Sequence, residues 1–232
     1  NSIFRFVKKV KPSIIFHLAA QPLIYESYKK PYDTFDINFR GSLNIVDISF
    51  KLKSVKSLLV ITSDKCYESN NSKVGFKEND ILGGVDPYSA SKASAEIMTR
   101  AYRKSFIKKN KKLGISTGRA GNVIGGGDWS EKRLIPDSIR SIMKNKTIEL
   151  RNPSFNRPWQ HVLEPLKGYL ILAQKQFNKK LKNVDNKWNF GPKKNNFVKV
   201  KDLVKKISKL QNIKKIKYSR SRFYETAKLM LN

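Results

Sequence analysis

The sequence predicts an α/β protein in which a doubly wound, mainly parallel sheet is followed by a smaller mixed α/β region. Two observations support this fold class. Short apolar runs at residues 13–18, 56–62 and 115–120 alternate with longer segments that have one apolar face, which is the order of strands and helices in an α/β sheet. The runs are also apolar throughout, as expected of parallel strands that helices cover on both faces.

The helices of the first half follow from the spacing of their apolar residues. A short helix ends at Pro12, and a second helix is expected over residues 33–53, close after Pro31. The apolar face of this second helix, which is expected to pack inward, carries Phe35, Phe39, Leu43, Val46 and Phe50. A third helix, rich in small residues, is expected over residues 88–109. We expect the three strands to be parallel neighbours.

After Gly127 the regular alternation gives way to a mixed pattern. The expected helices cover residues 134–144, 162–177 and 200–210, and the expected strands cover residues 147–150 and 187–190. We therefore divide the chain into a first domain, residues 1–128, and a smaller second region, residues 129–232.

The excess of basic residues is the main feature of the composition. The 232 residues include 48 Lys and Arg against 18 Asp and Glu, a formal net charge of +30. Such a charge can mark a nucleic-acid-binding surface. Lysines, however, outnumber arginines 37 to 11 and alternate with apolar residues at helical spacing. We interpret them as solvated helix faces, expect no nucleic-acid partner, and keep a basic nucleic-acid-binding module as an alternative.

Other features of the composition exclude further classes of protein. The single cysteine, Cys66, allows no internal disulfide and fits a reducing, cytoplasmic compartment. With two histidines and one cysteine, a His/Cys metal site is not expected. No apolar run reaches the length of a membrane span, so no membrane contact is expected either.

Tyr88 and Lys92 form the first candidate catalytic pair. Residues four apart lie on one face of a helix, and a lysine ammonium beside a phenol favours phenolate, which lowers the pKa of the tyrosine. A phenolate can remove a proton from a sugar hydroxyl. The same spacing occurs at Tyr25/Lys29 and Tyr224/Lys228, but only Tyr88 opens a long helix between two buried strands.

Polar and glycine-rich segments follow the predicted strands. Residues 62–65 (TSDK) end the second strand, where ligands of open α/β sheets bind, although Ser and Asp are also common in ordinary turns. Residues 119–129 end the third strand and contain three consecutive glycines, which let a loop approach a ligand closely. Arg151 and Arg157 suit a diphosphate, and His161 is read as a structural hydrogen-bonding residue.

Taken in order, these segments resemble the CDP-glucose 4,6-dehydratases, which belong to the extended short-chain dehydrogenase/reductase family of sugar-nucleotide dehydratases and epimerases. The resemblance extends from about Pro12 to the end of the chain. The segments that carry it are HLAAQ at 17–21, NFRGSLN at 38–44, TSDKCY at 62–67, DPYSASK at 86–92, RAGNVIGGGDW at 119–129, RLIP at 133–136, RPWQHV at 157–162 and WNFGP at 188–192.

The resemblance implies a catalytic role for five residues. Tyr88 is expected to remove the proton of the sugar 4-hydroxyl, Lys92 to hold the nicotinamide ribose, and Ser63 to hydrogen-bond the 4-oxygen. Asp64 is expected to protonate the departing 6-hydroxyl, and Lys65 to remove the C5 proton. In the related dTDP-glucose and GDP-mannose dehydratases the last two positions resemble Asp-Glu, so Lys65 favours the CDP-sugar branch.

The resemblance also implies binding residues for NAD and for the nucleotide sugar. The expected cofactor-binding residues are Ala19, Ala20, Thr62, Tyr88 and Lys92. The expected substrate-binding residues are Asn122, Leu134, Ile135 and Arg157. Residues 1–128 would then be a partial Rossmann-like NAD-binding domain and residues 129–232 mainly a substrate-binding region.

The function that the resemblance implies is NAD-dependent dehydration of CDP-glucose to CDP-4-keto-6-deoxyglucose, in deoxysugar synthesis for surface polysaccharides such as O-antigen. A homodimer is expected. The family's first glycine-rich strand-turn-helix unit has no counterpart in the sequence, and the C-terminal end looks short, so this chain alone is expected to be inactive. The alternatives are another NAD-dependent sugar-nucleotide dehydratase or epimerase, and the basic nucleic-acid-binding module.

Overall fold

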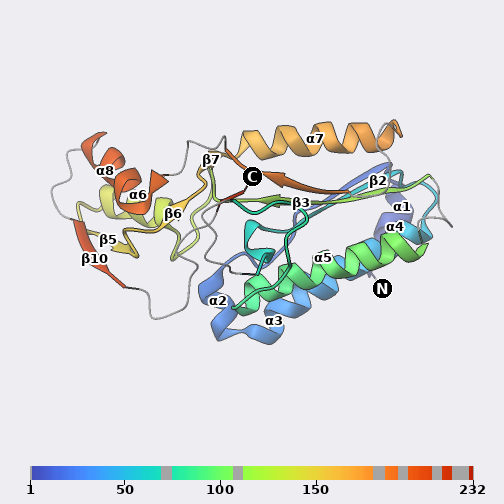
Figure 1. The fold of residues 1–232 in the computed structure, drawn as a ribbon, viewed down its shortest axis with the longest axis horizontal. Coiled ribbons are helices and arrows are strands. Elements are labelled where there is room, and N and C mark those ends of the chain that lie inside the picture. Colours follow the sequence, from blue (N-terminus) through green and yellow to red (C-terminus); the bar gives the residue numbers. More distant parts are fainter. Residues whose placement is uncertain are drawn as a thin grey trace.

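The main sheet has four parallel strands in the order β1-β2-β3-β8 (Figure 1). The computed structural model describes residues 2–68, 75–106, 112–179, 186–192, 198–210, 216–220 and 230–231. The strands are β1 (Ile14–His17), β2 (Ser57–Ile61), β3 (Gly114–Ala120) and β8 (Lys187–Phe190). The prediction that the first three are parallel neighbours is confirmed.

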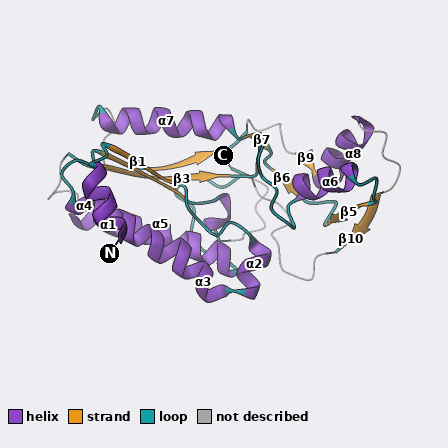
Figure 2. Ribbon diagram, turned by 180° about the vertical axis from the view of Figure 1, so that it is seen from behind, coloured by secondary structure: helices purple, strands orange, loops and turns teal. Residues whose placement is uncertain are grey.

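Helices cover both faces of this sheet (Figures 1 and 2). On one side lie α1 (Ser2–Val10), α4 (Gly41–Lys51) and α5 (Pro87–Phe106), and on the other side lies α7 (Leu163–Phe177). Successive residues of β2 alternate between these two layers: Leu58 and Val60 join a core with Met98 of α5, whereas Leu59 packs with Tyr169 of α7. The wholly apolar strands thus reflect burial on both faces, as the sequence predicted.

The helix expected over residues 33–53 is divided into three parts. These are α3 (Pro31–Phe35), a π-helical segment η1 (Asp36–Arg40) and α4. Asn38 lies fully buried in η1, and its side-chain amide donates to Gln21 O at 3.1 Å and to Ser91 Oγ at 2.9 Å. Single π turns often occur at functional sites, and this one turns a polar side chain toward the loop that follows β1.

The expected inward face of this helix is corrected at one position. Val46 is buried, and Phe39, Leu43 and Phe50 pack against the core that contains it. Phe35 instead is 37% exposed. It belongs to α3, before the π turn, and the change of helical period between α3 and α4 breaks the single apolar stripe that the spacing predicted.

The smaller region has a core of its own. Its strands β5 (Ile148–Arg151) and β10 (Ile216–Ser219) are parallel, and the helices α6 (Leu134–Met143) and α8 (Val200–Leu210) lie beside them (Figure 1). Ile148, Leu150, Val200 and Val204 are buried together. The expected helices and strands of residues 129–232 are all present. Across the whole chain, the sequence pattern missed these short elements: α2 (Ile24–Lys29), β4 (Val123–Ile124), β6 (Asn156–Arg157), β7 (Gln160–His161), β9 (Val198–Lys199) and β10.

The chain does not divide cleanly at residue 128. After forming part of the smaller region, it returns to the main sheet, where α7 covers one face and β8 pairs with β3. The sequence pattern could not show this return, because a strand such as KWNF carries no sign of which sheet it joins. Within the part of the chain that the structure describes, every helix is too short or too polar to cross a bilayer.

Candidate active site

The predicted catalytic residues come together where α5 begins beside the carboxyl end of β2. A 3₁₀ turn, η2 (Asp64–Cys66), directly follows this strand, and its N-cap residue Ser63 accepts a hydrogen bond from the Lys65 amide at 3.2 Å. Ser63, Asp64, Tyr88 and Lys92 are all buried. The parallel sheet therefore delivers a hydroxyl and a carboxyl from one strand end to a phenol and an amine from one helix face.

Asp64 is the most unusual member of this group. The Ser63 hydroxyl donates to its Oδ1 at 3.1 Å, but its buried Oδ2 has no hydrogen-bond partner among the described residues. Burial raises the pKa of the Asp64 carboxyl, and the positive charges of Lys65 and Arg157 oppose this increase only in part. A carboxyl with a raised pKa and an unused oxygen is suited to donate a proton to a ligand.

Tyr88 lies next to the same serine. Burial raises the pKa of its phenol to about 12, and a hydrogen bond with the Ser63 side chain opposes this shift. The sequence had predicted a lowered pKa from Lys92, and for this structure that expectation is wrong. The Lys92 ammonium donates to the Ile61 carbonyl oxygen at 3.1 Å, and the loss of hydration around the phenol is the larger effect.

Lys92 is held among polar groups of three elements. Burial lowers the pKa of its ammonium to about 8, while the negative charge of Glu96 raises it. His17, at the end of β1, has its pKa lowered to about 4, first by burial and then by the Lys92 charge. His17 Nε2 lies 3.0 Å from Ser42 Oγ. The neutral imidazole of His17 and the partly desolvated ammonium of Lys92 thus lie close together at the site.

The loop after β1 carries the two alanines predicted to line the cofactor. Ala19 is exposed and Ala20 is half-buried. The backbone of the adjacent Gln21 is fixed by Asn38, whose Oδ1 accepts from the Gln21 amide at 2.8 Å. Small side chains on a fixed backbone leave room for a flat or extended ligand at this sheet edge.

Three of the predicted substrate-binding residues, Arg157, Leu134 and Ile135, lie in the smaller region, whereas Asn122 lies just after β3 of the main sheet. Arg157 is buried, its Nη1 donates to the Asn156 carbonyl at 2.9 Å, and its charge acts on Asp64. Asn122 lies two residues after the end of β3, and Leu134 and Ile135 begin α6. Leu134 packs against the core of the smaller region. Of these four residues, the structure gives Arg157 the most direct relation to the catalytic group.

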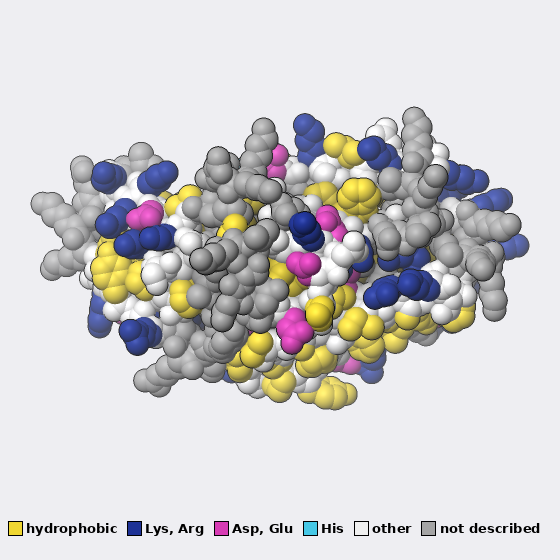
Figure 3. Space-filling model, viewed as in Figure 1, with side chains coloured by type: hydrophobic (Ala, Val, Ile, Leu, Met, Phe, Trp, Pro, Cys, Tyr) yellow, Lys and Arg dark blue, Asp and Glu magenta, His cyan; other side chains and the backbone are white. Residues whose placement is uncertain are grey.

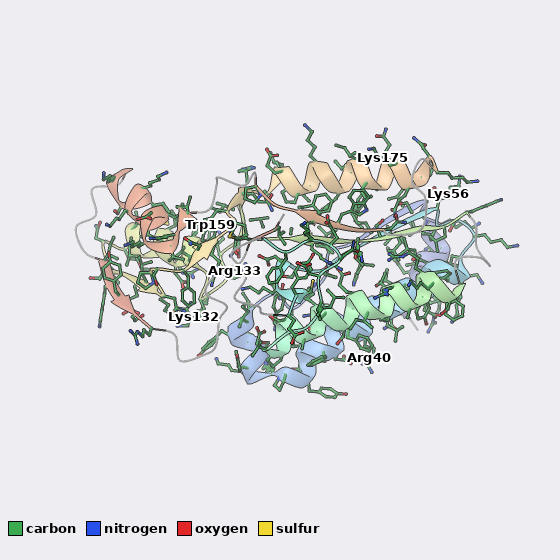
Figure 4. The ribbon with its side chains drawn as sticks, viewed as in Figure 1. Arg40, Lys56, Lys132, Arg133, Trp159 and Lys175 are labelled. Atoms are coloured by element: carbon green, nitrogen blue, oxygen red, sulfur yellow. The ribbon has the colours of Figure 1, made fainter. Side chains whose placement is uncertain are left out.

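Buried polar atoms without hydrogen-bond partners mark both sides of the site. Among the described residues they are Asp64 Oδ2, Asn122 Oδ1, Arg133 Nε and Trp159 Nε1, of which Arg133 Nε lies 3.7 Å from Asp128 Oδ2 in an ion pair. Arg133 and Trp159 lie at the junction between the main sheet and the smaller region (Figure 4). Because buried polar groups normally have partners, these two acceptors and two donors fit a polar ligand. Arg133 also lowers the pKa of Tyr88 through its charge, a relation that the sequence did not predict.

The sequence also missed a buried ion pair beneath the site. Arg119 Nη2 lies 2.7 Å from Glu96 Oε2, and the Thr62 hydroxyl donates to Glu96 Oε1 at 2.5 Å. The hydroxyl of Thr62, a residue predicted to bind the cofactor, is directed to Glu96. The spacing could have indicated Glu96, which continues the stripe of Tyr88 and Lys92 at a further interval of four residues. Among the described residues no three His, Cys, Asp or Glu side chains cluster as metal ligands would.

Comparison with known proteins agrees with this fold. The model of the GDP-mannose 4,6 dehydratase family matches residues 1–229, and the chain belongs to this family. It is 43% identical, over 211 residues that make up 89% of the chain, to a CDP-glucose 4,6-dehydratase of Salmonella typhimurium. A dTDP-D-glucose 4,6-dehydratase of Dictyostelium discoideum is 28% identical over 72% of the chain.

Solved structures show the same Rossmann-like fold at lower identity. A UDP-glucose 4-epimerase of Thermotoga maritima, solved with UDP-glucose, gives a TM-score of 0.84 at 22% identity, covering all of this chain and 72% of its own. A dTDP-glucose 4,6-dehydratase of Streptomyces venezuelae, solved with NAD, gives 0.83 at 19% identity, covering all of this chain and 67% of its own. The chain spans 57% of the length of the Salmonella relative and 40% of the Dictyostelium one.

Proposed function

We propose that the protein catalyses the NAD-dependent dehydration of CDP-glucose to CDP-4-keto-6-deoxyglucose. The observation that carries this proposal is the buried group of Ser63, Asp64, Tyr88 and Lys92, in which a carboxyl with a raised pKa lies close to the tyrosine. An epimerase needs no acid to expel a hydroxyl, whereas a dehydratase does. The 43% identity to the Salmonella CDP-glucose 4,6-dehydratase supports the choice of nucleotide.

The residues present fit an NAD molecule at the carboxyl edge of the sheet. Two observations support this fit: the buried Oδ2 of Asp64, just after β2, has no hydrogen-bond partner among the described residues, and Ala19, in the loop after β1, is exposed. When bound, NAD supplies the acceptor for the C4 hydride and later returns it to C6. Lys92 and the backbone at Ala19 and Ala20 would hold the cofactor. Thr62, which directly follows β2, would contact the cofactor at that end of the strand.

The side chains would then carry the proton transfers. Tyr88 takes the proton of the 4-hydroxyl as the C4 hydride leaves, and Ser63 donates a hydrogen bond to the 4-oxygen. The resulting ketone makes the C5 proton acidic, and Lys65 removes it. Asp64 protonates the 6-hydroxyl, which departs as water. A hydride then adds to C6 and a proton to C5, so that the net change is loss of one water.

The raised pKa of Tyr88 sets a condition on this mechanism. A phenol with a pKa of about 12 is protonated at neutral pH, so its proton must move on to another group as it accepts the sugar proton. The Ser63 hydroxyl is its hydrogen-bonded neighbour and donates in turn to Asp64 Oδ1, so the proton would pass through Ser63 to an ionised Asp64, which then becomes the acid that protonates the 6-hydroxyl. The positive charges of Lys92 and Arg133 would stabilise negative charge on the phenol as it forms.

The smaller region would hold the nucleotide. Arg157 would pair with the diphosphate through its guanidinium, and Asn122 would use its unpartnered Oδ1. Leu134 and Ile135 would contact the base or ribose. Residues 1–128 and 129–232 are proposed as the mainly cofactor-binding and mainly substrate-binding parts, with α7 and β8 completing the cofactor side.

We further propose a homodimer, a cytoplasmic location, and a role in making deoxysugars for surface polysaccharides. Exposed apolar side chains lie along the lower margin of the molecule, over α3 and α5 (Figure 3). They include Tyr32, Phe35, Ile37 and Ile97. Basic side chains are spread over several elements of this face (Figure 3), which agrees with solvated helix faces.

A product assay tests the function. The protein is incubated with NAD and CDP-glucose, both as this chain and as a chimera in which the chain replaces the matching part of the Salmonella relative. For the chimera, loss of one water and a 4-keto-6-deoxy sugar are expected with CDP-glucose, with slower turnover of the UDP, dTDP and GDP sugars; product from this chain alone would show that the rest of the relative is dispensable for the reaction. A C4 epimer formed without water loss would contradict the proposal and favour an epimerase.

A further inference from the structure

A buried ion pair lies directly beneath the proposed catalytic turn. Arg119 Nε and Nη2 donate to the two carboxylate oxygens of Glu96 at 2.9 and 2.7 Å. The side chains are 1% and 3% exposed. A bidentate pair of this kind fixes the orientation of both groups as well as their separation. Burying such a pair is seldom the most stabilising choice for a core, so its value to the protein is geometric.

Two threonines bind the same carboxylate, one directly after β2 and one in the neighbouring strand β3. The Thr62 hydroxyl donates to Glu96 Oε1 at 2.5 Å, and the Thr117 hydroxyl donates to Oε2 at 2.8 Å. Both residues are buried. They differ in their chain neighbours, because Thr62 immediately precedes Ser63 and Asp64, whereas Thr117 lies in the middle of β3.

The arginine of the pair holds the other end of the same turn. Arg119 Nη1 donates to Tyr67 Oη at 2.7 Å, and Tyr67 follows η2 directly. The Tyr67 hydroxyl in turn donates to Asn189 Oδ1 of β8 at 2.6 Å, and its ring stacks on Phe76. The segment from Ser63 to Cys66 is thus attached at its start to Glu96 and at its end to Arg119.

We propose that Glu96 and Arg119 are positioning residues for the dehydration, acting as a clamp on the two ends of the turn that carries Ser63, Asp64 and Lys65. Neither residue touches the reacting sugar. The clamp sets where the Asp64 carboxyl and the Ser63 hydroxyl stand relative to Tyr88 and Lys92, which lie on the same helix as Glu96. The proposal rests on the proposed function, but the clamp itself is a property of the chain that can be measured without turnover.

The matched threonines provide the test. Thr62→Val and Thr117→Val each remove one hydroxyl from Glu96 and leave the ion pair intact, so both variants are expected to fold. Thr62→Ser keeps the hydroxyl and serves as the rescue. Tyr67→Phe releases the other end of the turn. Each is compared with the unmodified chain by hydrogen-deuterium exchange of the peptide that covers residues 63–66, without cofactor or substrate.

Faster exchange in this peptide is expected for Thr62→Val and Tyr67→Phe and not for Thr117→Val or Thr62→Ser. In the Salmonella chimera the first two should lower kcat about 10- to 100-fold, because small misplacement of a reacting group has effects of that size, while KM for CDP-glucose stays within about 3-fold. Equal effects in Thr62→Val and Thr117→Val, or unchanged exchange at residues 63–66, would overturn the clamp. If the unmodified chimera forms no product, the proposed function fails and the exchange result alone decides the clamp.

Discussion

A Cβ atom at Gly121 would stand 3.3 Å from the Oδ2 atom of Asp64, the oxygen that has no hydrogen-bond partner. It would also stand 2.6 Å from Pro158 Cγ. Gly121 follows the end of β3 and so passes between the proposed acid and the loop of the smaller region. The absence of a side chain here lets the loop of the smaller region pack closely beside the carboxyl.

We predict that Gly121→Ala lowers kcat by about 10-fold or more, because the added methyl group must push Pro158 or Asp64 from its place. The free energy of unfolding should fall by about 1–3 kcal/mol through overpacking. Gly126→Ala is the control, since a Cβ there meets nothing within 4 Å. Steady-state kinetics and chemical denaturation measure both effects. Wild-type kinetics in Gly121→Ala would show that the reaction does not depend on this close packing beside Asp64.

A second prediction concerns the dependence of stability on pH. Burial and the Lys92 charge lower the pKa of His17 from 6.5 to about 4 in the folded state. The unfolded chain therefore binds the proton first as the pH falls below 6.5, and the free energy of unfolding decreases progressively until about pH 4. The full loss is about 3 kcal/mol, from about 1.4 kcal/mol for each pH unit between the two values.

The pH dependence can be assigned with the two histidines of the chain. His17→Gln should remove most of the decrease between pH 6.5 and 4 in urea denaturation, although it is less stable at neutral pH because it changes the contact with Ser42. His161→Gln exchanges the exposed histidine and should keep the wild-type profile. If His17→Gln loses stability with acid as steeply as the wild type, another group is responsible.

The sequence predicted the main sheet well, because its strands are buried on both faces and therefore apolar throughout. The runs over residues 13–18, 56–62 and 115–120 became β1, β2 and β3 in the expected parallel order. Short strands such as β6 and β9 were missed, since two residues carry no periodicity. The membership of β8 in the main sheet depends on contacts between residues far apart, which a local pattern cannot show.

The sequence predicted which catalytic residues would meet but not how their charges would behave. Ser63, Asp64, Tyr88 and Lys92 do come together. The pKa of Tyr88 nevertheless rises, because spacing shows that Lys92 shares its helix face and says nothing of how deeply the phenol is buried. Glu96 and Arg119 were missed for a related reason: two charged residues far apart in sequence look like surface until the fold pairs them.

The proposed dimer gives a third prediction. Ile97 of α5 is 56% exposed, and Leu170 of α7, on the opposite side of the sheet, is 62% exposed. If α5 packs against a second subunit, Ile97→Glu should convert the dimer to a monomer by placing a charge in an apolar interface. Leu170→Glu is the matched control and should stay dimeric. Light scattering at several concentrations measures both, and a wild-type protein that is monomeric throughout would remove the basis for a dimer.

Lys65 gives the sharpest prediction for the chemistry. Lys65 is the proposed base for the C5 proton, so its amine must be neutral when it reacts. The half-buried Lys65 side chain lies at the site beside Asp64, and its positive charge lowers the pKa of the Asp64 carboxyl. Lys65→Met should therefore stop elimination and leave oxidation at C4 partly intact, because Tyr88, Lys92 and Ser63 are unchanged.

In the Salmonella chimera, NADH absorbance should accumulate with CDP-glucose while 6-deoxy product falls at least about 100-fold. Lys56→Met is the control and should turn over normally, since Lys56 (labelled in Figure 4) directly precedes the first residue of β2, whereas Lys65 lies in η2 after the last. Product formation by Lys65→Met at a near-normal rate would show that another group removes the C5 proton, and the preference for the CDP-sugar branch that rests on this lysine would lose its chemical reason.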